Sequence, residues 1–412
     1  MTVLYKNGVD PKVIIEIIQT YLTGKDTKVF DPFFIQFITP TLRSIINFST
    51  DLIDDIQIHI INNTFVEIRG NITSTTLLAE INKQESKFLS NKIKNYYLFT
   101  TISLSRWDKL PEIRINGCSI RFGPKNANKF SSHREKILTS KVINYEHTIS
   151  SYLPVIVRVK ARMDSEAVVY ALNSLSLVRG IWNLHINRVE RWRMSLRIDT
   201  PVNKIILGKY HTLHNSDGTP TRDGYWYEPF YTNISPRNFN ANELLKLKTV
   251  LSNTRRKLRK CLFKPEIESF LINYCKALDT PDLESSFLQE WSLLEMMLQK
   301  DKYEKSKEII RRAACLDGKN QFSKLTLEAI YDQRNLFVHK SSEISESEVF
   351  VYHVKWFVEK GLSFLIDNCS DLPSRIEGIK FLELVGNKNS ELINEMAFYK
   401  RAVHYRRKLG LE

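Results

Sequence analysis

An arginine and a histidine five residues apart, Arg334 and His339, are the side chains in this sequence best suited to chemistry on a phosphate. A guanidinium can hold two oxygens of a phosphate and offset negative charge that grows during a reaction. An imidazole whose pKa lies near neutrality can take up or release a proton. Asn335 directly follows the arginine, and three apolar residues fill the gap before the histidine. This context favours a functional pair.

An ordinary structural role has to be weighed beside the chemical one. The bare spacing has low specificity, and about one chance match is expected in a basic chain of this length. Arg334 can pair with Glu328 or Asp332 on the same helix, and His339 can cap the C-terminal end of that helix, where the helix dipole favours a cation. A looser pair, Arg179 and His185, is excluded as a site, because we expect Gly180 to end the helix that Asp164 caps.

The segment resembles the Apea-like HEPN family of bacterial proteins. The signature of that family is a helix ending in R-N-x-x-x-H, which Arg334, Asn335 and His339 match. An upstream helix with an aromatic and acidic pattern belongs to the same signature, and residues 287–295 match it, with Arg311-Arg312 lying between the two segments. The resemblance covers roughly residues 240–370.

The resemblance implies cleavage of RNA without a metal ion or other cofactor. By the resemblance, Arg334 binds the phosphate, His339 is the acid–base residue, Asn335 supports them and Glu295 is an acidic partner from the upstream helix. RNA carries its own nucleophile, the 2′-hydroxyl, so in-line attack on the adjacent phosphate needs only proton transfers and charge stabilisation. The expected product is a 2′,3′-cyclic phosphate.

Helix geometry adds a constraint on assembly. Arg334 and His339 diverge by about 140° around a regular helix, whereas Asn335 and His339 share a face. A two-fold dimer would bring two copies of the motif to one cleft, and the resemblance also implies a homodimer. We expect apolar surface on the helices at 283–300 and 345–368 to supply the contact.

Basic residues offer candidate contacts to the RNA backbone. The formal net charge is +14, which favours a polyanionic partner. The candidates for nucleic-acid binding form one run on a predicted helix: Arg255, Arg256, Lys257, Arg259 and Lys260. A second basic run lies at 400–408. A solvated helix face is an equally good interpretation of both runs.

A change in composition near residue 235 divides the chain. We expect an α+β region over 1–235, in one or two lobes, followed by an all-α, HEPN-type helical bundle over 236–412. Helices are predicted at 242–262, 265–278, 283–300, 303–315, 323–339, 345–368, 373–386 and 390–408, with Asn240 or Asn242 capping the first of them.

The first region mixes helices with strands. Asp10 and Pro11 predict the start of a helix. Asn116-Gly117 predicts a hairpin between strands at 113–115 and 118–122, and a weaker hairpin is predicted around Asn62-Asn63 between strands at 56–60 and 65–68. Further strands are predicted at 155–159, 193–198 and 204–207.

Several function classes are excluded by missing patterns. The sequence has no apolar stretch of the roughly 20 residues that cross a bilayer and no signal-peptide pattern, so we expect a cytoplasmic protein without a membrane partner. The five cysteines are far apart, and His211 and His214 have no third ligand nearby, so no metal site is predicted. No P-loop and no nucleophile elbow is found.

Together these patterns predict a metal-independent RNA endonuclease, a bacterial anti-phage defence or toxin-like effector as the resemblance suggests. Residues 1–235 would then sense a phage-derived trigger or select the substrate. The alternatives are a non-catalytic HEPN module that binds nucleic acid or a partner protein, and a helical interaction protein with no nucleic-acid role.

Overall fold

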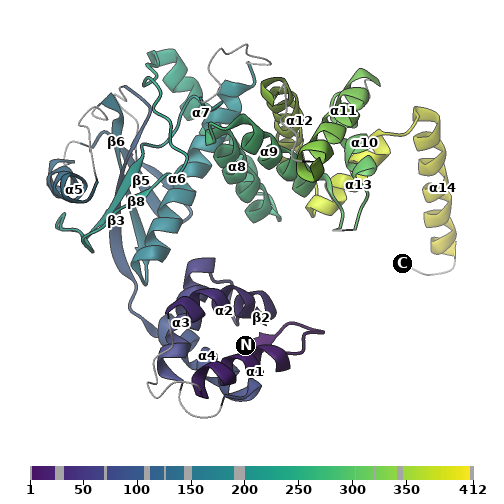
Figure 1. Ribbon diagram of the computed structural model, residues 1–412. Helices are drawn as coiled ribbons and strands as arrows, with labels where there is room; N and C mark the ends of the chain where they lie inside the picture. Colours follow the sequence, from purple (N-terminus) through teal and green to yellow (C-terminus); the bar gives the residue numbers. More distant parts are fainter. Residues whose placement is uncertain are drawn as a thin grey trace.

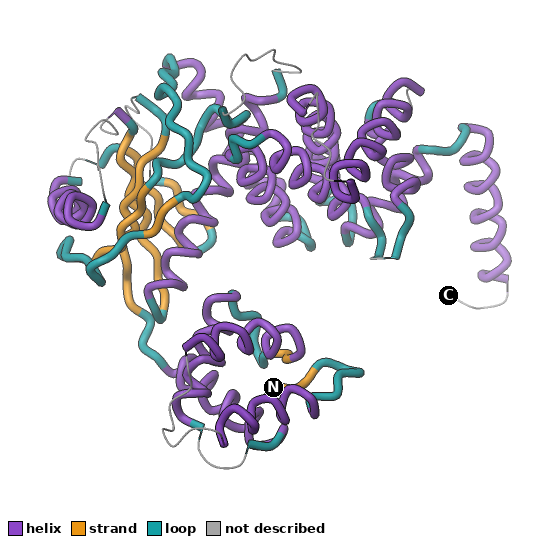
Figure 2. The backbone as a smooth tube through the Cα atoms, in the orientation of Figure 1, coloured by secondary structure: helices purple, strands orange, loops and turns teal. Residues whose placement is uncertain are grey.

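A computed structural model describes residues 2–23, 32–68, 72–105, 112–124, 127–142, 151–189, 200–301, 303–318, 321–340 and 347–408. Within these ranges the chain forms 14 helices, a two-stranded sheet and a six-stranded sheet, which confirms the mixed α+β class. The four N-terminal helices form one group, the larger sheet a second, and the remaining helices extend from the sheet (Figures 1 and 2). No described helix is both long enough and apolar enough to cross a membrane.

The N-terminal helices enclose a core of their own. They are α1 (Lys12–Thr23), α2 (Pro32–Ile45), α3 (Asp54–Glu67) and α4 (Ser74–Ser90), joined by the short strands β1 (Leu4–Tyr5) and β2 (Ile46–Asn47). The predicted start of α1 is confirmed, because the Asp10 carboxylate accepts a hydrogen bond from the backbone N–H of Lys12 at 2.9 Å.

The hairpin predicted around Asn62-Asn63 is wrong, because α3 runs through it. Ile56 and Ile60 are four residues apart, and so are Ile61 and Phe65. This is the spacing of residues one turn apart on a helix, and all four side chains are buried. Asn63 lies inside the helix and hydrogen-bonds to His59 one turn earlier. The asparagines therefore do not form a turn.

The six-stranded sheet is antiparallel, with the order β4-β5-β6-β3-β7-β8. Its strands are β3 (Lys94–Ile102), β4 (Ile113–Ile115), β5 (Cys118–Phe122), β6 (Leu153–Ala161), β7 (Tyr210–His214) and β8 (Trp226–Tyr227). The predicted hairpin at Asn116-Gly117 is confirmed, and both turn residues have positive φ, 46° and 75°. The strand predicted at 155–159 is also confirmed within β6.

The two faces of the sheet are covered by different helices. Phe99 and Ile156 pack with Phe130 of α5 (Asn128–Lys141), whereas the neighbouring residues Leu98 and Val157 belong to the main core that includes α6 (Asp164–Asn187). Successive strand residues point to opposite faces, so α5 and α6 lie on opposite sides of the sheet (Figure 1).

Neither of the two strands predicted between residues 190 and 210 is confirmed. Residues 204–207 form no strand, because Leu207 makes only an isolated bridge to Ile102. The strand predicted at 193–198 lies outside the described residues.

The prediction that Gly180 ends a helix is wrong, because α6 continues to Asn187 and contains His185. Gly180 lies where α6 packs against α8 (Lys264–Asp279). A Cβ atom at this position would lie 2.4 Å from the backbone oxygen of Leu271 in α8. The glycine therefore permits a close approach of two helices.

We expect Gly180→Ala to destabilise the protein by roughly 1–3 kcal/mol, because the added methyl group would force the two helices apart. Urea unfolding of the purified variant measures this loss. Gly224→Ala is a matched control, since its Cβ would meet only the Arg222 side chain, at 3.7 Å or more. Equal unfolding midpoints for the two variants would contradict the packing role.

The eight predicted C-terminal helices are confirmed, with ends that differ by a few residues. They are α7 (Ala241–Leu258), α8, α9 (Leu283–Leu298), α10 (Ser306–Leu316), α11 (Gln321–Lys340), α12 (Ser347–Asn368), α13 (Arg375–Val385) and α14 (Asn389–Lys408). The predicted cap of α7 is also confirmed, because Asn240 and Glu243 form a reciprocal capping box.

One hydrophobic core runs from the sheet into these helices, with buried residues on both sides of residue 235. The domain boundary at that residue stays a prediction, and it does not separate two cores. By contrast, α14 has no buried residue and stands apart from the other helices (Figure 1).

Candidate nucleic-acid cleavage site

Helix α11 carries the motif in its last two turns. The guanidinium of Arg334 donates a hydrogen bond from Nη1 to the Asn335 side-chain oxygen at 3.1 Å, and both residues are half-buried. Glu328, which the sequence offered as a partner of Arg334, pairs with Lys324 at 3.7 Å. His339 lies in the last turn of α11, and its side chain lies outside the described residues. The helix thus presents an arginine held by its neighbouring amide.

The upstream helix α9 brings Glu295 to the same region. The indole N–H of Trp291 donates to the Glu295 carboxylate at 2.7 Å. The Trp291 ring in turn lies 5.9 Å from the ring of Tyr331 in α11. Because Tyr331 is one turn before Arg334, the tryptophan links the acidic residue of α9 to the motif helix.

Tyr331 is a site residue that sequence reasoning missed. Hydrogen bonds from Ser306 and then Asn335 lower the pKa of its hydroxyl, and the positive charge of Arg334 lowers it further, while burial and the charge of Glu295 raise it. The tyrosine therefore interacts with three of the predicted site residues. Its position three and four residues before Arg334 and Asn335 was the available signal.

Arg311 and Arg312 lie between α9 and α11, the two helices that match the family signature. Of this pair, Arg312 has a structural role. That side chain is 1% exposed and makes ion pairs of 2.6 Å with both Glu304 and Glu383. It also donates to the backbone oxygen of Leu298 at 2.8 Å. Arg312 thus fastens α10 to α13 and to the end of α9.

The basic run at the end of α7 lies away from the motif. Figure 1 places α7 beside the sheet and α11 on the far side of α12. Lys257 pairs with Asp367 at 2.6 Å, and the Arg255 guanidinium donates to the backbone oxygen of Arg114 in the β4–β5 hairpin. Arg256, Arg259 and Lys260 are exposed. The structure therefore brings Arg334, Asn335 and Glu295 together. It places the basic run of α7 at a different part of the molecule.

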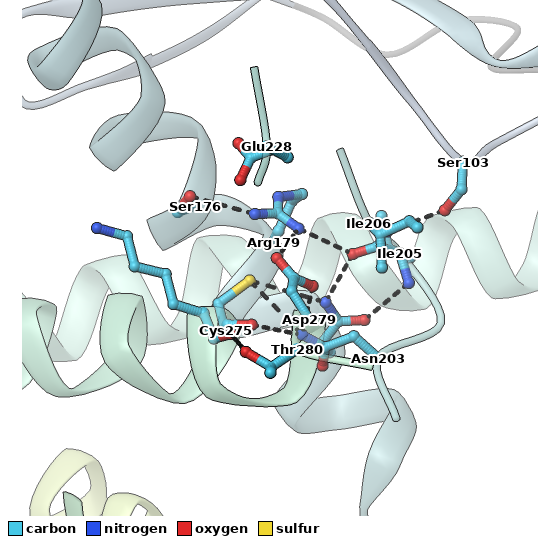
Figure 3. A network of polar contacts seen from close by, with 12 residues as sticks. Ser103, Ser176, Arg179, Asn203, Ile205, Ile206, Glu228, Cys275, Asp279 and Thr280 are labelled. Atoms are coloured by element: carbon cyan, nitrogen blue, oxygen red, sulfur yellow. Dashed lines mark hydrogen bonds and ion pairs between the residues drawn. The ribbon is translucent and has the colours of Figure 1, made fainter. Parts of the chain in front are cut away.

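The rejected pair at Arg179 and His185 contains a buried structural arginine. The Arg179 guanidinium donates to Asp279 of α8 at 2.8 Å, to the Ile205 backbone oxygen and to Ser176 (Figure 3). Asn203 donates to the same aspartate at 2.8 Å. This network joins α6, α8 and the segment that contains Asn203 and Ile205. Arg179 therefore has a structural role.

A second group of buried charges lies among α8, α9 and α12. Lys355 pairs with Glu359 at 3.0 Å, and the Tyr274 hydroxyl donates to the same carboxylate at 2.7 Å. Glu290 is completely buried beside them, and neither of its oxygens has a hydrogen-bond partner among the described residues. Burial, and then the charge of Glu359, raise the pKa of Glu290 well above its usual value.

No three histidine, cysteine, aspartate or glutamate side chains gather around a common point in the described part of the chain. His211 instead hydrogen-bonds to Thr100 at 2.7 Å and to Glu228 at 3.0 Å, and His214 bonds to Thr212 and the Gly218 backbone oxygen.

Comparisons of the chain with protein-family models, curated proteins and solved structures found no match.

Proposed function

We propose that the protein is a metal-independent RNA endonuclease of HEPN type, with Arg334 and His339 as its working residues. The observation that carries the proposal is the cluster of Arg334, Asn335 and Tyr331 in α11 with Glu295 of α9 nearby. A half-buried guanidinium positioned by an amide is suited to holding two phosphate oxygens. By the resemblance, residues 236–412 form the nuclease bundle, and residues 1–235 receive a phage-derived trigger or select the RNA.

The proposed reaction needs only groups of the chain and of the RNA. The 2′-oxygen forms a bond to the adjacent phosphorus, and the bond from phosphorus to the 5′-oxygen breaks. One proton leaves the 2′-hydroxyl and one is delivered to the 5′-oxygen, with His339 serving one or both transfers. Arg334 offsets the charge on the phosphate oxygens. The products are a 2′,3′-cyclic phosphate and a 5′-hydroxyl end.

We expect cleavage of single-stranded RNA to continue in EDTA and to fall strongly in Arg334→Lys. Lysine keeps the charge but loses the two-pronged geometry that holds a phosphate. Cleavage rates and product ends are measured on gels with a labelled oligonucleotide. Lys324→Ala on the same helix, where the lysine side chain is 49% exposed, measures separately how far cleavage depends on the positive charge of this helix.

An inactive protein that binds RNA in EDTA would support the non-catalytic alternative. Equal cleavage rates for Arg334→Lys and wild type would reject the proposed role of the guanidinium.

The homodimer is also proposed, with α14 as its contact. The apolar residues of α9 and α12 that were expected at the interface are buried within the chain, among them Phe287, Trp291, Leu294, Val351 and Leu362. In proteins most of the stability of a helix comes from packing of an apolar face, and α14 has no buried residue in the single chain. The α14 helix nevertheless exposes Met396, Tyr399 and Val403 with heptad-like spacing, so it fits a partner helix.

Charge distribution favours a second copy in antiparallel orientation. Glu391 and Glu395 lie in the first half of α14, and Lys400, Arg401 and Arg406 lie in the second half. Pairing two copies head to tail would place each acidic half beside a basic half, which sets orientation.

We expect a dimer in solution that Met396→Asp with Val403→Asp converts to a monomer, because both side chains are about half exposed in the isolated chain. Light scattering after gel filtration measures the mass, and Asn394→Asp on the same helix is the control. Mixing Arg334→Ala with His339→Ala chains should restore about one quarter of the activity if each site is composite. A monomeric wild type with full activity would overturn the dimer.

A further inference from the structure

A cavity of about 310 Å³ lies between the β4–β5 hairpin and the corner where α7 leads into α8. Five cationic side chains line it, and they come from a hairpin, a central strand and two helices: Arg114, Arg158, Arg255, Arg259 and Lys264. Glu268 is the single carboxylate among its lining residues. The lining therefore carries five positive charges and one negative charge, a net +4.

The hairpin and helix are held together across this cavity. The Arg255 guanidinium donates to the backbone oxygen of Arg114. On the other side, Glu268 accepts a hydrogen bond from the Asn116 side chain at 3.1 Å and pairs with Lys264 at 3.4 Å. The one carboxylate of the lining is thus already shared by two neighbours. Arg114 pairs at 3.1 Å with Glu112, which does not line the cavity, so Arg158, Arg255 and Arg259 are the lining cations without a carboxylate partner among the described residues.

Two of the cations have no partner within the described part of the chain. The side chains of Arg158 in β6 and of Arg259, directly after the end of α7, are exposed and make no hydrogen bond or ion pair there. Burial, and then the positive charge of Arg259, lower the pKa of Arg255. Like charges that face one cavity repel each other, and a bound anion would relieve that repulsion.

We propose that this cavity is a phosphate-binding site. A phosphate offers several oxygens in a compact group, and arginine forks match that geometry better than they match a single carboxylate. The cavity is large enough for a phosphate with an attached sugar. A phosphodiester of RNA and a free phosphate or nucleotide share this chemistry. The RNA source rests on the proposed function, and it would make the cavity a second anchor, separate from the motif in α11.

The sequence contains only part of this site. Arg255 and Arg259 belong to the basic run of α7, but Arg158 lies about a hundred residues earlier in a strand. The fold places it beside the helix, because β6 is the neighbour of β5, which carries the hairpin.

The test uses the full chain with Arg158→Ala and Arg259→Ala combined, in a His339→Ala background so that RNA stays intact. Binding is measured by fluorescence anisotropy with a labelled single-stranded RNA over a range of salt concentrations. We expect weaker binding and a salt slope smaller by roughly 1.4, since each lost contact to single-stranded nucleic acid removes about 0.7. Lys248→Ala is the control, because Lys248 is exposed on α7 but does not line the cavity.

Calorimetric titration with inorganic phosphate and with adenosine monophosphate, in parallel, distinguishes the two sources. Loss of both RNA and free-phosphate binding in the double variant supports the site with RNA as a ligand. Loss of free-phosphate binding alone supports the site and rejects its use by RNA. If RNA and phosphate bind the double variant as they bind the control, the proposal is overturned. Urea unfolding checks that the double variant is folded. Because no arm depends on cleavage, an inactive wild type would reject the nuclease without affecting this result.

Discussion

His339→Ala is expected to reduce RNA cleavage by about 10² to 10⁴-fold, the usual contribution of a positioned acid–base group. The imidazole would no longer take the proton from the 2′-hydroxyl or deliver one to the 5′-oxygen. Because His339 lies in the last turn of α11, replacing it should leave the buried helices and the unfolding free energy nearly unchanged. Single-turnover cleavage with excess protein measures the chemical step.

The matched control for this loss is His185→Ala. His185 follows Arg179 at a similar spacing, but Arg179 is fully occupied in the network of α6 and α8. We expect this variant to cleave RNA at the wild-type rate. Full activity of purified, folded His339→Ala would reject the histidine as catalytic and leave Arg334 as an RNA-binding residue at most.

The second large effect concerns the buried carboxyl of Glu290. A raised pKa means that the folded protein keeps the proton where the unfolded chain releases it. The unfolding free energy should therefore decrease as pH rises above the ordinary glutamate value of 4.5, by about 1.4 kcal/mol for each pH unit, until the raised pKa is reached. At lower pH both states hold the proton, and this loss is absent.

Glu290→Gln should remove that pH dependence, because the amide has a similar shape and does not titrate. Urea unfolding of both proteins at pH 5.5, 6.5 and 7.5 gives the comparison. We expect the variant to become more stable relative to wild type with each upward step that lies below the raised pKa of Glu290. Glu284→Gln in the first turn of the same helix is the control. Parallel pH profiles for wild type and Glu290→Gln would contradict a protonated Glu290.

Features that depend on neighbouring residues could be predicted from the sequence. Asn116 and Gly117 form the predicted hairpin because their positive φ angles are a local property of the turn. Asn240 caps α7 because its partner Glu243 is three residues away. The C-terminal helices follow from apolar spacing within each segment. Local signals of this kind need no knowledge of distant contacts.

Local signals failed where packing against distant elements decided the outcome. Gly180 has the appearance of a helix end, but contact with Leu271, some ninety residues later, makes it an interior residue of α6. Asn62 and Asn63 resemble a turn, yet burial of Ile56 with Ile60 and of Ile61 with Phe65, pairs that are each one helical turn apart, favours the helix α3.

The candidate sites divide in the same way. The sequence by itself determined that Arg334 and Asn335 are adjacent on a helix, and that Arg255 and Arg259 share a turn of another. Only the tertiary structure decided that Glu295 and Trp291 approach Tyr331, and that Arg158 joins the cations of α7 around one cavity. The reason is physical: spacing along a helix follows from its regular geometry, whereas proximity between elements depends on which apolar faces are buried together.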